Sequence, residues 1–348
     1  MTPGRSAALA RRLVPDRVSA GHEREITVDR SNDCVVVDDA VFVKWLTPPV
    51  PAPHPGSAVL AHLRLVAFAE MPAFLGSASD GELVTALVFE NVVGARDGWE
   101  WFFEEVMAFA DGSSDRAVAV DSARRIGALA ADLHAALATP SDVLPDPVGS
   151  VGAAVERDRC RALLADALDV VTSAAYPEAH AVLRARSRRL AAEIESMPSR
   201  LTPAIAAHGD LHLGQVLRAG ARLAVIDFEG NPLTVAPIEL TQRPAAVDVA
   251  SLLQSVDHAV RMVQHRRPGR DAEFDALAVH LAACTLDGYR QRSSAPGHSD
   301  LLDDQLLPGL RAAQELHELV YAVRRLPRWV YAPTLALRAM FAPASDLD

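Results

Sequence analysis

One stretch of the chain, residues 208–229, restricts the possible folds more than any other part of the sequence. It reads HGDLHLGQVLRAGARLAVIDFE, in which two apolar runs flank a short turn that contains glycine. Such a pattern predicts a β-hairpin. The hairpin brings Gln215 close to Asp227 and leaves Asp210 just before its first strand. An amide and two carboxylates gathered in this way suit a divalent cation and the deprotonation of a hydroxyl group.

The spacing of these residues matches the catalytic loop of protein kinases, H-R-D-x-x-x-x-N, which is followed later by D-F-G. His208, Asp210 and Gln215 keep the offsets of that loop, with glycine in place of its arginine and glutamine in place of its asparagine. The tripeptide D-F-E at 227–229 stands where D-F-G is expected. On these residues the chain resembles the aminoglycoside-phosphotransferase-like kinases. Within them it is most similar to the actinobacterial maltokinase-like group, which includes glucosamine kinases.

The same stretch has two other interpretations. His208, Asp210 and His212 have the residue types of a zinc site, as in a metal-dependent phosphohydrolase. Such a hydrolase needs further histidine ligands at suitable positions, and the segment that follows Glu229-Gly-Asn-Pro232 does not supply them. A purely structural hairpin does not explain an aspartate, a glutamine and a second aspartate at kinase offsets. The sequence therefore favours a kinase, and the phosphohydrolase is the alternative from a different class.

Length, charge and cysteine spacing bound the class of protein. A chain of 348 residues exceeds one typical core and predicts two lobes, and half of the residues are hydrophobic. The net charge of −11 and the lack of a basic patch with interleaved aromatic residues predict no nucleic-acid partner. Cys34, Cys160 and Cys284 are far apart and fit a reducing compartment. Without a signal-peptide core or a membrane-length apolar run, we expect a cytoplasmic protein with no membrane partner.

Lysine occurs once in the sequence, at position 44, although lysine and arginine together number 34. An ammonium group meets phosphate as a compact point charge, whereas guanidinium is a wide planar fork, so a retained lysine suggests a chemical role. The alternative is a chance survivor on an exposed strand. Residues 25–29, 34–38 and 41–45 predict three short antiparallel strands, with Lys44 on the third. The resemblance places the phosphate-binding lysine of kinases on that strand.

The usual partner of that lysine is missing from the sequence. Residues 47–55 are rich in proline and predict a linker, and residues 57–70 predict a helix. In kinases this helix carries a glutamate that pairs with the lysine, but the segment has no glutamate before Glu70 at its far end. His62 is the polar residue that we expect to face inward, and the partner of Lys44 stays open.

An apolar strand is predicted over residues 82–89, and the sequence ENVV follows it. The resemblance implies that this segment connects the two lobes and that main-chain groups near Glu90 and Val92 bind the adenine of ATP. The next predicted helix opens with Trp99 and Trp101 in its first turns. Both tryptophans are assigned to helix packing.

The remainder of the chain is predicted to be mostly helical, because apolar residues recur at helical spacing and prolines stand near the boundaries. The predicted helices are residues 115–139, 153–174, 177–197, 245–261, 272–291 and 301–326. Asp248 lies near the start of one of them. We expect it to cap that helix or, as the resemblance implies, to bond the backbone of the catalytic loop. His134 is expected to be structural.

The last third of the chain suggests how an acceptor is bound. Glu315 and Glu318 are three residues apart and therefore share one face of their predicted helix. Trp329 follows in the segment LPRW, and this region resembles the helix and the R-P-x-W segment that line the sugar pocket of maltokinases. A pair of carboxylates suits an ammonium ligand, and the face of a tryptophan suits a sugar ring. Taken alone, the two glutamates are most typical of a solvated helix face, and their place beside the tryptophan in the acceptor region favours binding.

Together these features predict an α+β protein with a bilobal, protein-kinase-like fold. Residues 1–90 are expected to form a small nucleotide-covering lobe. Residues 91–348 are expected to form a helical lobe that holds the hairpin at 208–229 and the acceptor pocket.

The resemblance assigns a role to each polar residue of the expected site. Lys44 contacts the phosphates of ATP, and Gln215 and Asp227 hold Mg²⁺. Asp210 accepts the proton of the acceptor hydroxyl. Glu229 is either a second metal ligand or a ligand of the acceptor. The presence of Lys44, Asp210 and Asp227 argues against a kinase-like binding module without catalysis.

The expected substrates are ATP and a small sugar. The leading acceptor is glucosamine, which would be converted into glucosamine 6-phosphate. Maltose, giving maltose 1-phosphate, and an aminoglycoside antibiotic are alternatives within the same chemistry. Full-length maltokinases carry a longer N-terminal cap than the stretch before Lys44 provides, which argues against maltose.

Overall fold

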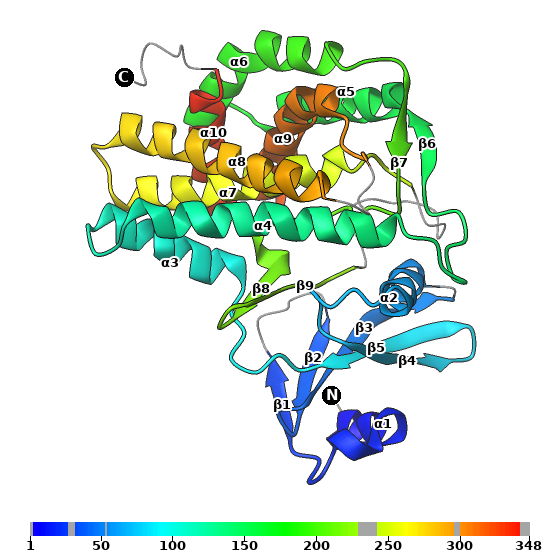
Figure 1. Ribbon diagram of the computed structural model, residues 1–348. Helices are drawn as coiled ribbons and strands as arrows, with labels where there is room; N and C mark the ends of the chain where they lie inside the picture. Colours follow the sequence, from blue (N-terminus) through cyan, green and yellow to red (C-terminus); the bar gives the residue numbers. More distant parts are fainter. Residues whose placement is uncertain (1–2, 27–31, 53, 229–241, 296–299, 342–348) are drawn as a thin grey trace. The chain divides into compact units, whose positions relative to one another are not determined.

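The computed structural model describes residues 3–26, 32–52, 54–228, 242–295 and 300–341, and Figure 1 shows its ribbon. The chain divides into two compact units. The first consists of residues 1–96, 139–147 and 215–241, and the second of residues 97–138, 148–214 and 242–348. This division differs from a single cut at residue 90, because the chain returns to the first unit twice.

The first unit contains a five-stranded antiparallel sheet with the strand order β1-β2-β3-β5-β4. The strands are β1 (Glu23–Ile26), β2 (Asp33–Val37), β3 (Val41–Pro51), β4 (Phe74–Asp80) and β5 (Leu83–Glu90). Valine is frequent in the central strands, where its β-branched side chain packs well on a pleated surface. The predicted meander and the apolar strand before the ENVV segment are therefore confirmed, whereas β4 was not predicted. Lys44 lies on β3, opposite Cys34 of β2 and Leu87 of β5.

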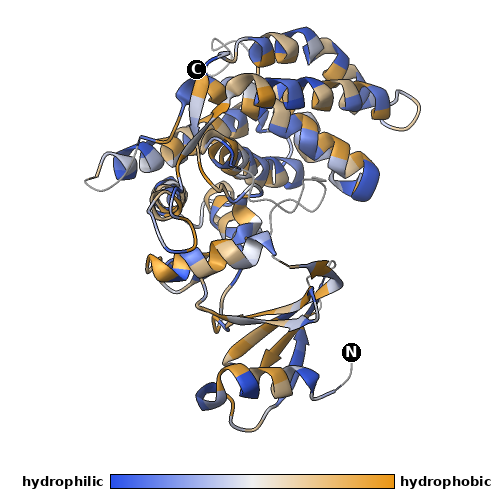
Figure 2. Cartoon of the chain, turned by 90° about the vertical axis from the view of Figure 1, so that its right-hand side faces the viewer, coloured by the Kyte–Doolittle hydropathy of each residue, from blue (hydrophilic) through white to orange (hydrophobic). Residues whose placement is uncertain are grey.

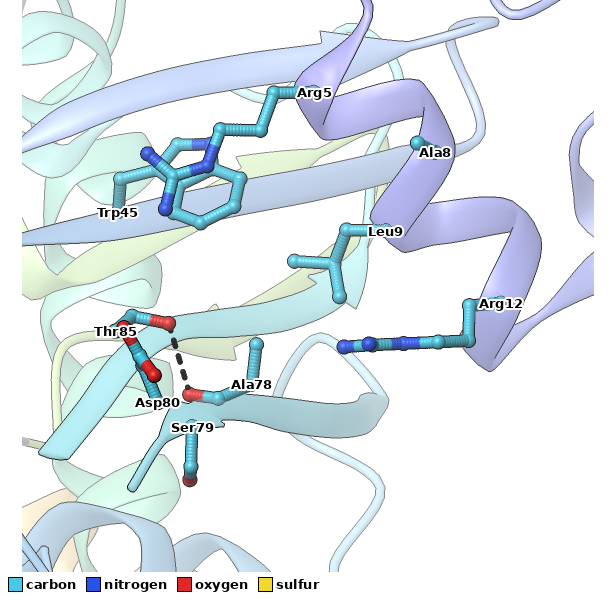
Figure 3. Close-up of a pocket in the computed structure, with 9 residues that line it drawn as sticks. All are labelled: Arg5, Ala8, Leu9, Arg12, Trp45, Ala78, Ser79, Asp80 and Thr85. Atoms are coloured by element: carbon cyan, nitrogen blue, oxygen red, sulfur yellow. Dashed lines mark hydrogen bonds between the residues drawn. The ribbon is translucent and has the colours of Figure 1, made fainter. Parts of the chain in front are cut away.

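Helix α1 (Arg5–Leu13) covers one face of this sheet with Ala7, Leu9 and Ala10, which share a core with valines of β2, β3 and β5. The indole nitrogen of Trp45 donates a hydrogen bond to Ser6 Oγ over 2.9 Å, which fastens the helix to β3. Beside this contact lies an open groove of about 430 Å³, lined by residues of α1, β3, β4 and β5 (Figure 3). The groove contains none of the predicted site residues.

The proline-rich segment differs from its predicted structure. It was predicted as a linker over 47–55, but β3 continues to Pro51 with a register shift between Trp45 and Val50. The following helix α2 (Pro55–Leu65) begins with proline, whose fixed φ suits the first helical position. The His54 side chain caps it by accepting a hydrogen bond from the Ser57 N–H over 3.1 Å.

The predicted hairpin is present as β8 (Val216–Ala219) and β9 (Arg222–Val225), with Val216 paired to Val225. Its turn includes Gly220 in the left-handed region at φ 58°, which glycine adopts without steric cost. The hairpin joins the first unit through backbone hydrogen bonds, from Arg96 to Arg218 in both directions and from Val225 N–H to the Glu70 carbonyl.

The second unit is mainly helical. Its helices are α3 (Gly98–Ala110), α4 (Arg116–Leu137), α5 (Ala153–Val170), α6 (Pro177–Glu195), α7 (Ala246–Arg266), α8 (Asp271–Ser293), α9 (Leu307–Arg325) and α10 (Tyr331–Ala339). Strands β6 (Gly149–Gly152) and β7 (Leu201–Ala204) form a small antiparallel ladder. Figure 2 shows hydrophilic and hydrophobic residues alternating along these helices, as expected for helices with one packed face. The long predicted helices are confirmed, whereas α10 and the ladder were not predicted.

Helices α4 and α8 pack closely because glycines stand at their contact. A β-carbon added to Gly127 would lie 1.8 Å from the Thr285 carbonyl oxygen, and one added to Gly288 would lie 2.1 Å from the Arg124 carbonyl oxygen. Helix α7 is enclosed on nearly all sides, because nearly every residue from Ala246 to Gln264 is buried. None of the helices in the described ranges is both long and apolar enough to cross a bilayer.

Candidate active site

The predicted site residues fall into two groups, one in each compact unit. In the second unit, Asp248 in the first turn of α7 anchors the catalytic loop. Its carboxylate accepts hydrogen bonds from the backbone N–H groups of His208 and Gly209, both over 2.8 Å. The predicted bond to the loop backbone is therefore confirmed. The predicted cap is wrong, because the N-cap residue of α7 is Ala245 and no side chain caps the helix.

His134 completes the support of this carboxylate. Its Nε2 lies 3.2 Å from Asp248 Oδ2, and its Nδ1 lies 2.9 Å from the Tyr289 hydroxyl. Burial is the largest influence on the pKa of Asp248 and raises it, but these hydrogen bonds and the nearby imidazoles outweigh burial and hold that pKa below its usual range. The predicted structural role of His134 agrees with these contacts.

Asp210 follows this anchored turn. Its backbone N–H donates to His208 Nδ1 over 3.3 Å, and its side chain is 23% exposed. Three residues on, the Leu213 N–H donates to Ser255 Oγ of α7 over 3.0 Å. The loop that carries the expected base is thus fixed to α7 on both sides of Asp210, while the carboxylate itself keeps contact with solvent.

A chain of aromatic rings leads away from this loop. The ring centroid of Trp99, on α3, lies 5.9 Å from that of His212 and 6.1 Å from that of Trp329. Trp329 in turn contacts Tyr331 at 5.7 Å. Trp99 was expected to serve helix packing, so its place in this arrangement was not predicted. Fully buried Trp101 is a packing residue, as predicted. The glycine before Trp99 was the available signal, because a small residue there permits close approach of another backbone.

Lys44, Gln215 and Asp227 come together in the first unit. Lys44 Nζ lies 2.6 Å from Asp227 Oδ1, and the Gln215 side-chain amide lies 3.4 Å from Asp227 Oδ2. The Lys44 side chain is only 8% exposed, against 38% for Asp227. Asp227 has φ 68°, a left-handed conformation that costs a non-glycine residue energy and recurs at functional sites. The partner that the sequence left open for Lys44 is therefore Asp227.

Helix α2 places two histidines in the same unit. His62 is fully buried, and its Nδ1 lies 2.8 Å from Ser141 Oγ. His54 lies close enough to Lys44 that burial and the ammonium charge both lower its pKa. His62 faces inward, as expected, and His54 was missed because a capping role requires knowing where the helix begins.

The predicted adenine-binding segment begins at the end of β5. The Glu90 carboxylate lies 3.5 Å from the Arg222 guanidinium and accepts a hydrogen bond from the Ala73 N–H over 3.3 Å. Asn91 is fixed by backbone and side-chain bonds to the β2–β3 turn. The Val92 carbonyl accepts from the Ala95 N–H, while the Val92 N–H donates to no residue in the described part of the chain.

The two glutamates of α9 differ in their surroundings. Glu315 is completely buried, and its Oε2 lies 3.1 Å from Nε2 of His258 on α7. Its other oxygen, Oε1, is buried without a hydrogen-bond partner among the described residues. Glu318 is partly exposed and accepts a hydrogen bond from the Gln314 amide over 3.2 Å. His258 was not foreseen, because its contact joins helices that are distant in sequence.

Charge and burial set the protonation of this pair. Burial raises the pKa of Glu315 to about 7. For His258, burial acts in the lowering direction, but the facing carboxylates of Glu315, Glu318 and Asp257 raise its pKa to about 9. The facing carboxylates thus favour the protonated imidazole of His258, and burial favours the protonated carboxyl group of Glu315.

The expected metal ligands and Glu229 are only partly covered by the structure. Glu229 lies outside the described residues. Among the residues that are described, no group of three or more histidine, cysteine, aspartate or glutamate side chains is arranged to hold a metal ion. Gln215 and Asp227, the two residues expected to hold Mg²⁺, are joined by a hydrogen bond from Gln215 Nε2 to Asp227 Oδ2.

Known proteins resemble this chain over most of its length. The family model described as "Phosphotransferase enzyme family" matches residues 48–275. The glucosamine kinase of Streptacidiphilus jiangxiensis is 37% identical over 326 residues, which cover 90% of this chain and 72% of that protein. The glucosamine kinase of Mycolicibacterium smegmatis is 36% identical over 334 residues, which cover 92% of this chain and 80% of that protein.

The fold agrees with these sequence matches. A solved structure of a glucosamine kinase in complex with glucosamine, ADP and inorganic phosphate matches with a TM-score of 0.78 and 36% identity, covering 90% of this chain and 79% of that one. The predicted α+β, kinase-like fold is therefore confirmed. Because the family model spans well over half of the sequence, this chain belongs to the phosphotransferase enzyme family.

Proposed function

We propose that this protein is a glucosamine kinase that transfers the γ-phosphate of ATP to the 6-hydroxyl of the sugar. One observation supports this proposal most directly. In the second unit, the loop that carries Asp210 is linked through His212 and Trp99 to Trp329, just beyond the helix that carries Glu318. A candidate base, an aromatic wall and a carboxylate thus belong to one connected region. The relatives that match most of the chain carry the same activity in their names.

The first unit supplies the residues for the nucleotide. Lys44 is a compact cation suited to the phosphates of ATP. The Val92 N–H, which has no acceptor in the described part of the chain, is suited to the adenine ring. Gln215 and Asp227 would hold Mg²⁺, which bridges phosphate oxygens and neutralises charge that develops during transfer. Asp227→Ala should therefore abolish Mg²⁺-dependent turnover, whereas Gln215→Asn should be tolerated because asparagine is the common ligand in kinases.

Asp210 is the proposed base. Its carboxylate is partly exposed on a loop that Asp248 holds rigidly, so it can meet an acceptor hydroxyl without reorganising the backbone. It accepts the hydroxyl proton and orients the oxygen toward the phosphorus atom. Asp210→Asn keeps the shape but removes the basicity, and we expect kcat to fall by roughly 10²-fold or more.

The acceptor region is best suited to an amino sugar. Glu318 is accessible and can contact an ammonium group directly, while Glu315 stands behind it, three residues earlier on the same helix face. A neutral sugar such as maltose would bring no ammonium group to the Glu318 carboxylate, and a charge that is partly buried without such a partner is costly. Trp329, also partly exposed, is placed to stack on the sugar ring. Glu229 remains a candidate second ligand of metal or sugar.

An aminoglycoside is the second candidate acceptor, because it also carries ammonium groups. The length and identity of the match to glucosamine kinases favour the smaller sugar. Use of ATP together with the widely spaced cysteines favours action in the cytoplasm.

A phosphorylation screen tests the proposal. Purified protein is incubated with ATP, Mg²⁺ and one acceptor at a time from glucosamine, glucose, N-acetylglucosamine, maltose and kanamycin. We expect glucosamine to have the highest kcat/KM, with the product identified as the 6-phosphate by NMR. N-acetylglucosamine should be poorest among the monosaccharides, since acetylation removes the charge and adds bulk. A higher kcat/KM for maltose or kanamycin would replace the proposed acceptor.

A further inference from the structure

The imidazole of His212 is held in one orientation by the loop that it belongs to. The backbone N–H of Gly214 donates a hydrogen bond to His212 Nδ1 over 3.0 Å. A ring nitrogen that accepts a hydrogen bond carries no proton, so the neutral imidazole bears its hydrogen on Nε2. The loop therefore determines which ring nitrogen of His212 is a donor.

That donor faces the proposed base. His212 Nε2 lies 3.9 Å from Asp210 Oδ2, and the two side chains are exposed to similar extents, 27% and 23%. The separation is longer than a hydrogen bond. Catalytic hydrogen bonds are often long in the absence of substrate and shorten once the acceptor is bound. Because the loop holds the ring, the gap closes only if the Asp210 carboxylate turns toward it.

Close packing restricts the ring further. A β-carbon at Gly214 would lie 2.7 Å from His212 Cε1 and 2.7 Å from Trp99 Nε1, so glycine alone leaves room for both rings. The plane of Trp99 is inclined by 32° to that of His212. A β-carbon at Gly98 would lie 2.3 Å from the Leu213 carbonyl oxygen, which brings the start of α3 against the same loop. Trp99 therefore acts as a wall behind the His212 ring.

We propose that His212 is a positioning residue for phosphoryl transfer: its Nε2–H holds the Asp210 carboxylate in the orientation that accepts the hydroxyl proton. This inference rests on the proposed function, in which Asp210 is the base. A carboxylate that pivots freely aligns with the acceptor oxygen for only part of the time, whereas a charge-assisted hydrogen bond fixes one oxygen and directs the other outward. Trp99 contributes by limiting rotation of the imidazole.

Two amide substitutions separate this role from simple packing. The amide of asparagine takes the place of Nδ1, so His212→Asn retains a partner for the Gly214 N–H but presents no donor to Asp210. The longer side chain of glutamine puts its amide where Nε2 stands, so His212→Gln retains that donor and loses the Gly214 contact. Both replacements are neutral and polar, and they differ by one methylene.

Steady-state kinetics with glucosamine and ATP give the expected order. His212→Asn should lower kcat by about ten- to a hundredfold, the range that corresponds to loss of a hydrogen bond to an ionised group. His212→Gln should keep the larger share of wild-type kcat. KM for ATP should be unchanged in both variants. His280→Asn, an exposed substitution on α8, is the matched control and should behave as wild type.

The opposite order would overturn the inference. If His212→Asn keeps full kcat while His212→Gln loses it, the histidine serves only the fold of the loop. A thermal melt of each variant separates loss of kcat from loss of folded protein. Asp210→Asn separates failure of the proposed base from failure of the proposed role of His212. If that variant remains active, the assignment of the base fails. If it is inactive while His212→Asn is fully active, only the role of His212 fails.

Discussion

Two buried carboxylates in the second unit, each beside a buried histidine, are treated differently by the fold. Asp248 pairs with His134 and accepts two backbone N–H groups, so both of its oxygens are satisfied. Glu315 pairs with His258 through one oxygen only, and its second oxygen has no partner among the described residues. A satisfied carboxylate contributes to architecture, whereas an unsatisfied one stores a cost that a ligand can relieve.

The pKa values follow the same division. Although burial acts on both groups in the raising direction, the pKa of Asp248 is lowered and that of Glu315 is raised to about 7. Hydrogen bonds to the charged form make the difference. Asp248 is therefore fully engaged in supporting the loop, whereas Glu315 keeps one oxygen without a partner among the described residues.

The largest effect is expected from removing the satisfied carboxylate. Asp248→Ala leaves two N–H groups and His134 buried without an acceptor, and breaking a buried pair in this way costs on the order of 3–5 kcal/mol. Urea denaturation should show this loss in unfolding free energy, together with loss of kcat. Asp287→Ala, an exposed change on α8, should stay within about 0.5 kcal/mol of wild type. A mild effect of Asp248→Ala would remove the distinction between the two carboxylates.

A smaller and more selective effect is expected at Glu315. Glu315→Gln should lower stability less than Asp248→Ala does, because one oxygen of Glu315 already lacks a partner among the described residues, and it should reduce the preference for glucosamine over glucose. The expected reduction in the kcat/KM ratio is roughly ten- to a hundredfold, the range of a charge-assisted bond. Trp329→Ala is the control. Stacking on the sugar ring does not depend on the amine, so kcat/KM should fall equally for both sugars. An unchanged sugar ratio would show that Glu315 does not sense the ligand.

The pH dependence of stability should run in opposite directions for the two carboxylates. Folding lowers the pKa of Asp248 from 3.8, so its contribution is present above that value and is lost in acid. Folding raises the pKa of Glu315 from 4.5 to about 7, so its contribution is present below pH 4.5 and is lost as the pH rises through 7.

His258 extends the second trend, because its pKa rises from 6.5 to about 9 and its contribution is lost above that pH. The other charged groups that act on this pair are Asp257 on α7 and Glu318 on α9. Asp257 is in turn influenced by Arg261 on α7 and Arg311 on α9, and Arg261 by Asp275 on α8. Unfolding free energy measured between pH 5 and 9.5 (about the range spanned by these pKa values) should therefore decline more steeply in wild type than in a Glu315→Gln/His258→Gln variant. The difference should be on the order of 1–3 kcal/mol. Parallel curves would contradict the pKa assignments.

The smallest effect concerns the first unit, where Asp227 is the more exposed member of an ion pair. Lys44→Arg preserves the charge but replaces a compact donor with a wide fork, and we expect KM for ATP to rise several-fold, equivalent to about 1 kcal/mol. Stability should not change. The control is the opposite exchange at an exposed position of α2, Arg64→Lys, which should leave KM for ATP unchanged. Kinetics equal to wild type would mean that the single lysine is a coincidence of composition.

How much of this could be predicted from the sequence depends on the range of each interaction. The hairpin, the position of Lys44 on β3 and the long helices were predictable, because periodicity and turn residues are local signals. The partner of Lys44 was not, since Asp227 is 183 residues away and no local pattern encodes that contact. The His258–Glu315 pair joins residues 57 apart for the same reason. The linker predicted over residues 47–55 was wrong at residues 47–51, because proline is tolerated in the extended strand found there.

The solitary lysine also gives the chemist a selective handle. Because the sequence has one ε-amino group, amine-directed acylation of side chains can occur only at Lys44, whose side chain is 8% exposed and held by Asp227. The extent of labelling then reports on the occupancy of the proposed phosphate site, and ATP should slow it. Because Lys44 is the single lysine, a second lysine introduced on the surface would be the main side-chain site at which a dye or a solid support couples.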